Sequence, residues 1–278
     1  MTLIKKSINL LFSSDPELGN IRVLDSGGSS FIATLDTTID IDPAAQDITV
    51  SQQSGTVWFN FANIKEGVNN LFYISGQNNN NELQSIILEI PTGLYNISTL
   101  NQAIRRELVN NDFDEADPVI QLIGDDATQK VIIKLLPGSS VDFTQPNTPR
   151  EILGFDSVLL QTQGTEEFFL ANNIARFNQI GSLLINSDIV DTGLIVNGKF
   201  NSTLSQILID VGVGEQIQYN PRNPVTLSAN NLLGTKRKNI KFFLTDELLR
   251  PLDTRGEYWT VRILIEYYIP FIIEKSFR

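Results

Sequence analysis

The chain has 278 residues, 41% of them hydrophobic, and a net charge of −11 at pH 7. This length is long for a single domain but lies within the range of large all-β domains. The excess of negative charge repels phosphate groups, which argues against nucleic acid as a partner of the whole chain. No run of 18 apolar residues occurs, so the sequence predicts no transmembrane helix and no membrane partner.

Cysteine and histidine are both absent from the chain. Their absence excludes disulfides, thiolate nucleophiles, Ser–His–Asp or Cys–His catalysis and histidine metal sites. Carboxylate, lysine and tyrosine chemistry remain. The sequence therefore offers no local catalytic set, and we expect no cofactor and no metal site.

The first part of the chain is rich in short apolar runs. Residues 1–20 contain Lys5 and Lys6 followed by apolar residues, too short and interrupted a pattern for a signal peptide, so we expect synthesis in the cytosol and an N-terminal arm. Residues 21–80 hold strand-like runs separated by Gly, Asn, Asp and Ser, which is typical of sandwiches and barrels. In one of these runs Trp58 lies on the opposite side from Val57.

A block with a different character follows at residues 81–165. It contains a predicted strand, an amphipathic helix at 98–111, two further strands and a one-turn helix near 148–154. Thr99 and Gln102 fit a capping box at the start of the long helix. We therefore predict a small α+β domain inserted into a β-protein.

The β pattern resumes in residues 166–278 and ends in a long strand predicted at 257–269. Along this strand apolar residues alternate with a mixed face that still carries Tyr258, Leu264 and Tyr268. Exposing such apolar side chains to water is unfavourable in free energy, and a partner subunit would cover them. We therefore take these three residues, together with Trp58, as candidate subunit contacts. The predicted fold class is mainly β, a single sandwich made from both ends of the chain and interrupted by the α+β block.

Two charged clusters have alternative interpretations. The acidic stretch 112–117 offers carboxylates to a calcium ion, but it lacks the glycine and final glutamate of an EF-hand loop and is also typical of a solvated turn. A candidate basic patch is formed by Lys236, Arg237, Lys238 and Lys241. It would meet an acidic neighbour or nucleic acid, or it would simply protect an edge strand from pairing.

Several segments, together about two-thirds of the chain, resemble the penton, or minor capsid, proteins of virophages and polinton-like double-stranded DNA viruses. They are "IILEIPTGLYNISTLNQAI" (86–104), "TPREILGF" (148–155), "LLINSDIV" (183–190), "STLSQILI" (202–209), "YNPRNPV" (219–225) and "LTDELLRPLDTRGEYWTVRILIEY" (244–267). The resemblance implies a single jelly roll with an inserted domain and no catalysis.

The same resemblance implies a virion component, five copies of which close an icosahedral vertex and contact the major capsid protein. The N-terminal arm would reach a neighbouring subunit, and the insert would contact a host receptor or a fibre. Two other interpretations stay open: a receptor- or carbohydrate-binding β-module such as a fibre or tail head, and a glycosidase with two facing carboxylates.

Overall fold

The computed structural model describes residues 2–178, 180–196 and 198–271. The chain divides into two compact units. The sandwich unit consists of Met1–Phe61 and Ile180–Arg278, and the insert consists of Ala62–Gln179. Each unit is described by itself below.

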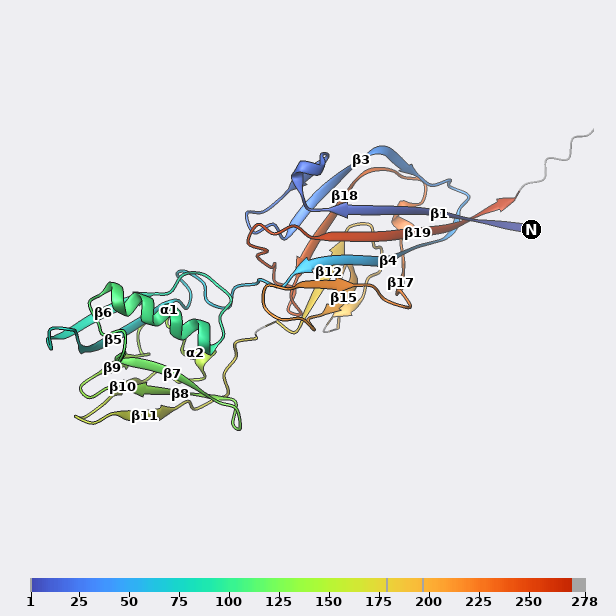
Figure 1. Cartoon of the computed structure of the whole chain (residues 1–278). Helices are drawn as coiled ribbons and strands as arrows, with labels where there is room; N and C mark the ends of the chain where they lie inside the picture. The colour runs from blue at the N-terminus through green and yellow to red at the C-terminus, as the bar shows by residue number, and fades with distance from the viewer. Residues whose placement is uncertain (1, 179, 197, 272–278) are drawn as a thin grey trace, which may run out of the picture. The chain divides into compact units, whose positions relative to one another are not determined.

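Two antiparallel sheets form the sandwich unit (Figure 1). In spatial order, the first sheet contains β1 (Thr2–Ser13), β19 (Thr260–Phe271), β4 (Gln46–Trp58) and β16 (Gln216–Tyr219), and β17 (Thr226–Ser228) also pairs with β4. The second sheet contains β15 (Thr203–Leu208), β12 (Ser182–Ser187), β18 (Lys236–Thr245), β3 (Ser30–Asp40) and β2 (Ile21–Val23). The connections hold the hairpin of β13 (Ile195–Val196) and β14 (Lys199–Phe200), and the 3-10 helices η1 (Pro16–Leu18) and η2 (Asn230–Leu232).

The pairing order of these strands is that of a jelly roll. The first long strand pairs with the last (β1 with β19), β3 pairs with β18, β4 pairs with β16 and β17, and β12 pairs with β15. Along the chain, β1, β3, β4 and β12 lie in alternate sheets, β15 stays beside β12, and β16, β18 and β19 alternate again, as in a long hairpin wrapped into a sandwich. This topology confirms the predicted fold class, and the insert interrupts the chain between β4 and β12.

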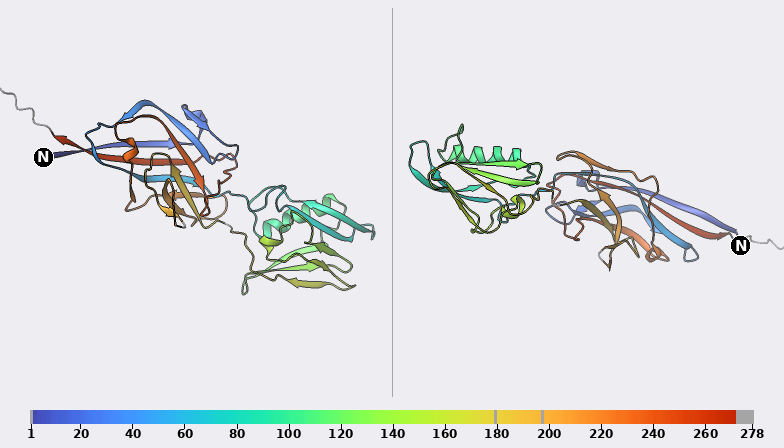
Figure 2. Two further views of the ribbon diagram at one scale, coloured as in Figure 1. Left: turned by 180° about the vertical axis from the view of Figure 1, so that it is seen from behind. Right: turned by 90° about the horizontal axis from the view of Figure 1, so that it is seen from below.

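The N-terminal segment is a strand of the sandwich and not a free arm. β1 pairs with β19 along its whole length, from Thr2 opposite Phe271 to Ser13 opposite Thr260. Figures 1 and 2 show these two strands, from opposite ends of the chain, side by side. The prediction of an arm over residues 1–20 is corrected, because alternation along β1 sends Phe12 into the core with 6% of its surface exposed.

Large aromatic side chains join the two sheets. The Phe12 ring lies 5.0 Å from that of Phe242 on β18, and the Trp259 ring lies 4.9 Å from that of Phe31 on β3. Trp259, Val261, Ile263 and Ile265 are all fully buried, as their alternation in the sequence predicted. The last strand begins at Thr260, later than the predicted residue 257, because residues 255–256 form a turn.

The insert packs two small sheets and two helices around its own core. One sheet contains β10 (Leu159–Gln161), β9 (Ser140–Asp142), β5 (Leu71–Gln77) and β6 (Leu83–Glu89), and the other contains β11 (Glu167–Leu170), β8 (Lys130–Leu135) and β7 (Ile120–Asp125). The helices are α1 (Ile97–Asn110) and α2 (Arg150–Leu153). The insert extends beyond the predicted 81–165 at both ends, because β5 pairs with β6 and β9 and because β11 pairs with β8.

Helix α1 is capped by a different residue from the one that the sequence pattern indicated. Asn96 is the N-cap: its Oδ1 accepts the Thr99 backbone N–H at 2.9 Å, and Thr99 Oγ1 accepts the Asn96 N–H at 2.9 Å. Thr99 is thus the third helical residue of the box, not its cap, and Gln102 is one turn too late. The buried residues of α1 are Leu100, Ala103, Ile104 and Leu108, on the predicted face.

We expect Asn96→Ala to lower the stability of the insert by about 1 kcal/mol, since it removes the side-chain oxygen that accepts the Thr99 backbone N–H and leaves only the bond from the backbone N–H of residue 96 to Thr99 Oγ1. Gln102→Ala, a change to an exposed residue of the same helix, is the matched control and is expected to have almost no effect. Thermal unfolding followed by the far-UV helical signal measures both. A larger loss for the Gln102 variant would contradict this assignment of the cap.

Candidate subunit-contact surface

The outer face of the β1-β19-β4-β16 sheet, called the outer face below, is the side turned away from the core. Strand alternation defines it, because the neighbours of buried core residues point the other way. On β19 it begins near Thr260, whose hydroxyl lies 2.8 Å from that of Thr56 on β4. Leu264 lies opposite Asn9 on one side and Ser51 on the other, and Tyr268 lies opposite Lys5 and Gln46.

The four predicted contact residues occupy a strip along this face. Trp58, at the end of β4, is 37% exposed, and Tyr258, just before β19, is 46% exposed. Leu264 and Tyr268 are partly covered by neighbouring side chains. The antiparallel register places Trp58 and Tyr258 at one end of the sheet and Tyr268 at the other, roughly 33 Å away along β19. The structure therefore sets these residues in a row and not in one cluster.

Leu11 is a further apolar residue of the outer face that sequence reasoning assigned to the arm. It lies opposite Arg262 and is 69% exposed, while Phe12 beside it is buried. Period-two alternation over residues 3–13, once these residues are taken as a strand, would have identified it.

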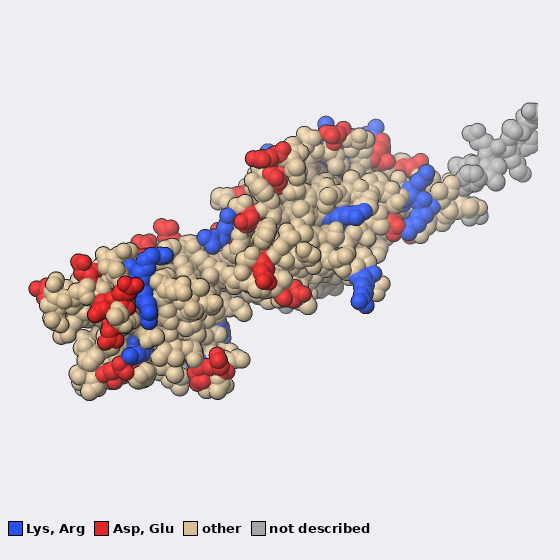
Figure 3. Space-filling view, in the orientation of Figure 1, with Lys and Arg blue, Asp and Glu red and all other residues tan. Residues whose placement is uncertain are grey.

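Polar groups with few charges occupy the area between these apolar residues. A hollow of about 470 Å³ lies over the strands, lined by residues that include Asn9, Thr56, Gln218, Thr260 and Arg262. Arg262 Nε donates to Asn9 Oδ1 at 2.9 Å. Nearby, Lys5 pairs with Glu266, and this hydrogen bond raises the pKa of the lysine. Figure 3 shows few charged side chains over β1, β19 and β4.

The predicted basic patch is partly neutralised, because two of its four cations pair with acids of other strands and loops. Lys236 Nζ lies 3.6 Å from Asp40 Oδ2, and Arg237 forms an ion pair with Asp188. Lys241 Nζ lies 5.5 Å from the centre of the Phe243 ring, and Lys238 is exposed. Residues 236–241 pair with β3, whereas β12 pairs with β18 only at residues 242–245. This one-sided pairing favours edge protection over a binding role.

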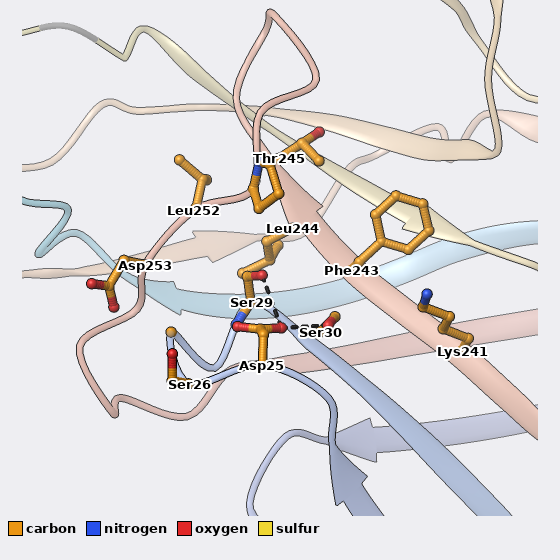
Figure 4. A pocket seen from close by; sticks show the side chains of 12 residues that line it. Asp25, Ser26, Ser29, Ser30, Lys241, Phe243, Leu244, Thr245, Leu252 and Asp253 are labelled. Atoms are coloured by element: carbon orange, nitrogen blue, oxygen red, sulfur yellow. Dashed lines mark hydrogen bonds between the residues drawn. The ribbon is translucent and has the colours of Figure 1, made fainter.

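A second hollow, of about 500 Å³, lies on the other sheet (Figure 4). Figure 4 shows Asp25 turned toward Ser29 and Ser30, with Lys241 and Phe243 on the opposite wall. Burial raises the pKa of Asp25, but hydrogen bonds from Ser30 and Ser29 outweigh it and leave the pKa below its ordinary value. Asp253 Oδ1 accepts the backbone N–H of Arg255. Both carboxylates thus serve local turns, which gives no support to a glycosidase pair.

Neither metal ligation nor a membrane helix is supported in the described ranges. Within them, no group of three or more acidic side chains is placed to hold a metal ion. In the acidic stretch 112–117, Asp114 Oδ1 accepts the N–H of Ala116, as in a local turn. No helix among the described residues is long and apolar enough to cross a bilayer.

Fold and surface together define a jelly-roll protein with an α+β insert and an outer face that bears exposed apolar residues and few charges. No family model and no curated protein matches the chain. Several solved structures are similar to it, including the following two. The mavirus penton protein has 13% sequence identity and a TM-score of 0.44, covering 95% of this chain and 100% of the other. A chain of the Sputnik virophage has 11% identity and a TM-score of 0.38, covering 94% and 97%.

Proposed function

We propose that this protein is a non-catalytic structural subunit of a virus capsid that forms pentamers at icosahedral vertices. The observation that carries the proposal is the outer face, where Leu11, Trp58 and Tyr258 are exposed on an otherwise polar sheet. Aromatic and apolar side chains in a surface depleted of charge are typical of subunit contacts. The sequence resemblance to virophage penton proteins directs the proposal to the vertex.

Such a subunit would act through the angle at which neighbouring copies contact each other. One patch of each copy binds a different patch of the next, and this head-to-tail contact closes into a ring when each step turns by one-fifth of a circle. Every copy brings a net charge of −11, so like charges would repel across most contacts. A nearly uncharged outer face lets two copies approach at a small electrostatic cost.

The proposed partners follow from this role. The remaining outer surface of the ring would contact the major capsid protein, and the insert would face a host receptor or a fibre. The protein would be made in the host cytoplasm and would then reside in the virion.

The mass of the purified full-length protein in solution tests the proposal. A stable pentamer is expected, measured by light scattering over a range of protein concentrations. A trimer would contradict it and favour a fibre or tail head. A protein that stays monomeric, both alone and when mixed with the major capsid protein, would also contradict it.

Trp58→Asp is expected to weaken pentamer formation about 30-fold or more, because it places a charge in a contact that excludes water. Phe168→Asp, which alters an exposed side chain of the insert, is the matched control and should leave the mass unchanged. Sedimentation of both variants measures the effect. Equal dissociation of the two would show that the outer face is not the contact.

A further inference from the structure

The β10-β9-β5-β6 sheet of the insert carries a groove on the side turned away from its core. The groove has a volume of about 330 Å³ and crosses strands β6, β5, β9 and β10. Tyr73, Ile87 and Leu159 form its apolar walls, and Ile87 and Leu159 are 56% and 50% exposed. In the register of the sheet, Ile87 lies opposite Tyr73 and Leu159 lies opposite Asp142.

Polar groups of the groove lie beside these walls. Ser85 lies opposite Ser75, and Ser75 lies opposite Ser140, so one hydroxyl is supplied by each of three adjacent strands. Neighbouring strands are about 4.8 Å apart, which is close to the length of one sugar ring. Ser85 Oγ donates to Ser75 Oγ at 3.2 Å, and each hydroxyl keeps further capacity to donate or accept.

Asp142 adds a fixed carboxylate to this set. Its Oδ1 accepts the backbone N–H and the hydroxyl of Thr144, and its Oδ2 accepts the side-chain amide of Gln145. These hydrogen bonds, that of the Thr144 hydroxyl first, lower the pKa of Asp142, so the group stays ionised near neutral pH. A carboxylate oriented in this way is a strong acceptor for ligand hydroxyl groups.

The groove does not suit a peptide that binds as an added strand. β5 is paired on both sides, with β6 and β9, and β9 is paired with β5 and β10. The backbone groups of these two central strands are therefore already paired, so recognition within the groove depends on side chains. An aromatic face that packs against C–H groups, beside hydroxyls and a carboxylate that exchange hydrogen bonds with O–H groups, fits a sugar.

Charge narrows the class of sugar. The insert, residues 62–179, has 15 Asp and Glu residues against 7 Lys and Arg residues, a net charge of −8 out of −11 for the chain. Such a surface, with Asp142 in the groove itself, repels sialic acid and sulfate groups.

We propose that this groove is a binding site for a neutral oligosaccharide, with Tyr73 as the stacking surface and Asp142 and the serine hydroxyls as hydrogen-bonding partners. The site lies in the insert alone, so it does not depend on the outer face or on the oligomeric state. It gives the insert a chemically defined ligand, as a receptor-contacting domain requires.

Binding of the full-length protein to neutral tetrasaccharides of glucose, galactose, mannose and N-acetylglucosamine, measured by titration calorimetry, tests this site. We expect at least one of them to bind and matched sialylated or sulfated sugars to bind more weakly. Tyr73→Ala and Asp142→Asn should each weaken binding about tenfold or more. The mass of the assembled protein should stay the same in both variants, which separates this site from the subunit contact.

Phe168→Ala is the matched control, since Phe168 is an exposed aromatic of the other sheet of the insert, at 58% exposure. Its binding should equal that of the unmodified protein. The proposal is overturned if no neutral tetrasaccharide binds at millimolar concentration, if acidic sugars bind more tightly, or if Phe168→Ala reduces binding as much as Tyr73→Ala. Folding of each variant is checked by its far-UV spectrum.

Discussion

Trp259→Ala is expected to lower the free energy of unfolding of the sandwich unit by about 3–5 kcal/mol, the range for removal of a buried large aromatic side chain. Trp259 is fully buried and packs edge-on against Phe31. Its Nε1–H also donates to the Gly28 carbonyl oxygen at 3.1 Å, so the substitution removes a hydrogen bond from this partly buried acceptor. The cavity would lie where the last strand meets the second sheet.

Chemical denaturation followed by tryptophan fluorescence measures this loss, because the remaining Trp58 also lies in the sandwich unit. Trp58→Ala provides the control within the same strand layer. Since Trp58 is 37% exposed, we expect its removal to cost about 1 kcal/mol or less. Similar losses for the two variants would contradict the assignment of Trp259 to the core and Trp58 to the surface.

Phe143→Ala is expected to destabilise the insert by about 3–5 kcal/mol for the same physical reason. The Phe143 ring is fully buried, 5.4 Å from the ring of Phe155 and 6.4 Å from that of Phe72. Phe143 directly follows β9, Phe155 lies in the segment after α2, and Phe72 lies on β5. Phe143 therefore connects the sheet of the insert to its short helix, and its loss removes contacts on both sides.

Two signals in one experiment assign this effect to the insert. Both α-helices of the described residues lie in the insert, whereas both tryptophans lie in the sandwich unit. In Phe143→Ala, the far-UV helical signal should be lost at lower denaturant while the tryptophan transition keeps its midpoint, since each unit has a core of its own. An equal shift of both signals would show that the two units unfold together.

Local patterns in the sequence predicted the secondary structure of individual segments and the face that each one buries. Alternation from Trp259 to Ile265 predicted a strand with one buried face, and all four residues of that face are buried. The four-residue repeat of Leu100, Ile104 and Leu108 predicted the buried face of α1 in the same way. Such periodicities are properties of neighbouring residues, so the sequence carries them directly.

Partners that are distant in the chain could not be predicted in this way. The ion pair of Arg237 with Asp188 and the row of Ser85, Ser75 and Ser140 depend on strand register, which no local pattern specifies. The cap of α1 was misplaced by three residues because Asn96 and Thr99 both suit an N-cap, and only the helix geometry distinguishes them.

Composition alone determined that catalysis by cysteine or histidine is excluded, and alternation alone determined that the chain is mainly β with one amphipathic helix. The tertiary structure decided that the first strand pairs with the last, which turned a predicted arm into the edge of the sandwich and brought Leu11 onto the outer face. It also decided that β5 and β11 belong to the insert. The physical reason is that alternation fixes which side of a strand is buried, whereas the choice of neighbouring strand depends on packing over the whole domain.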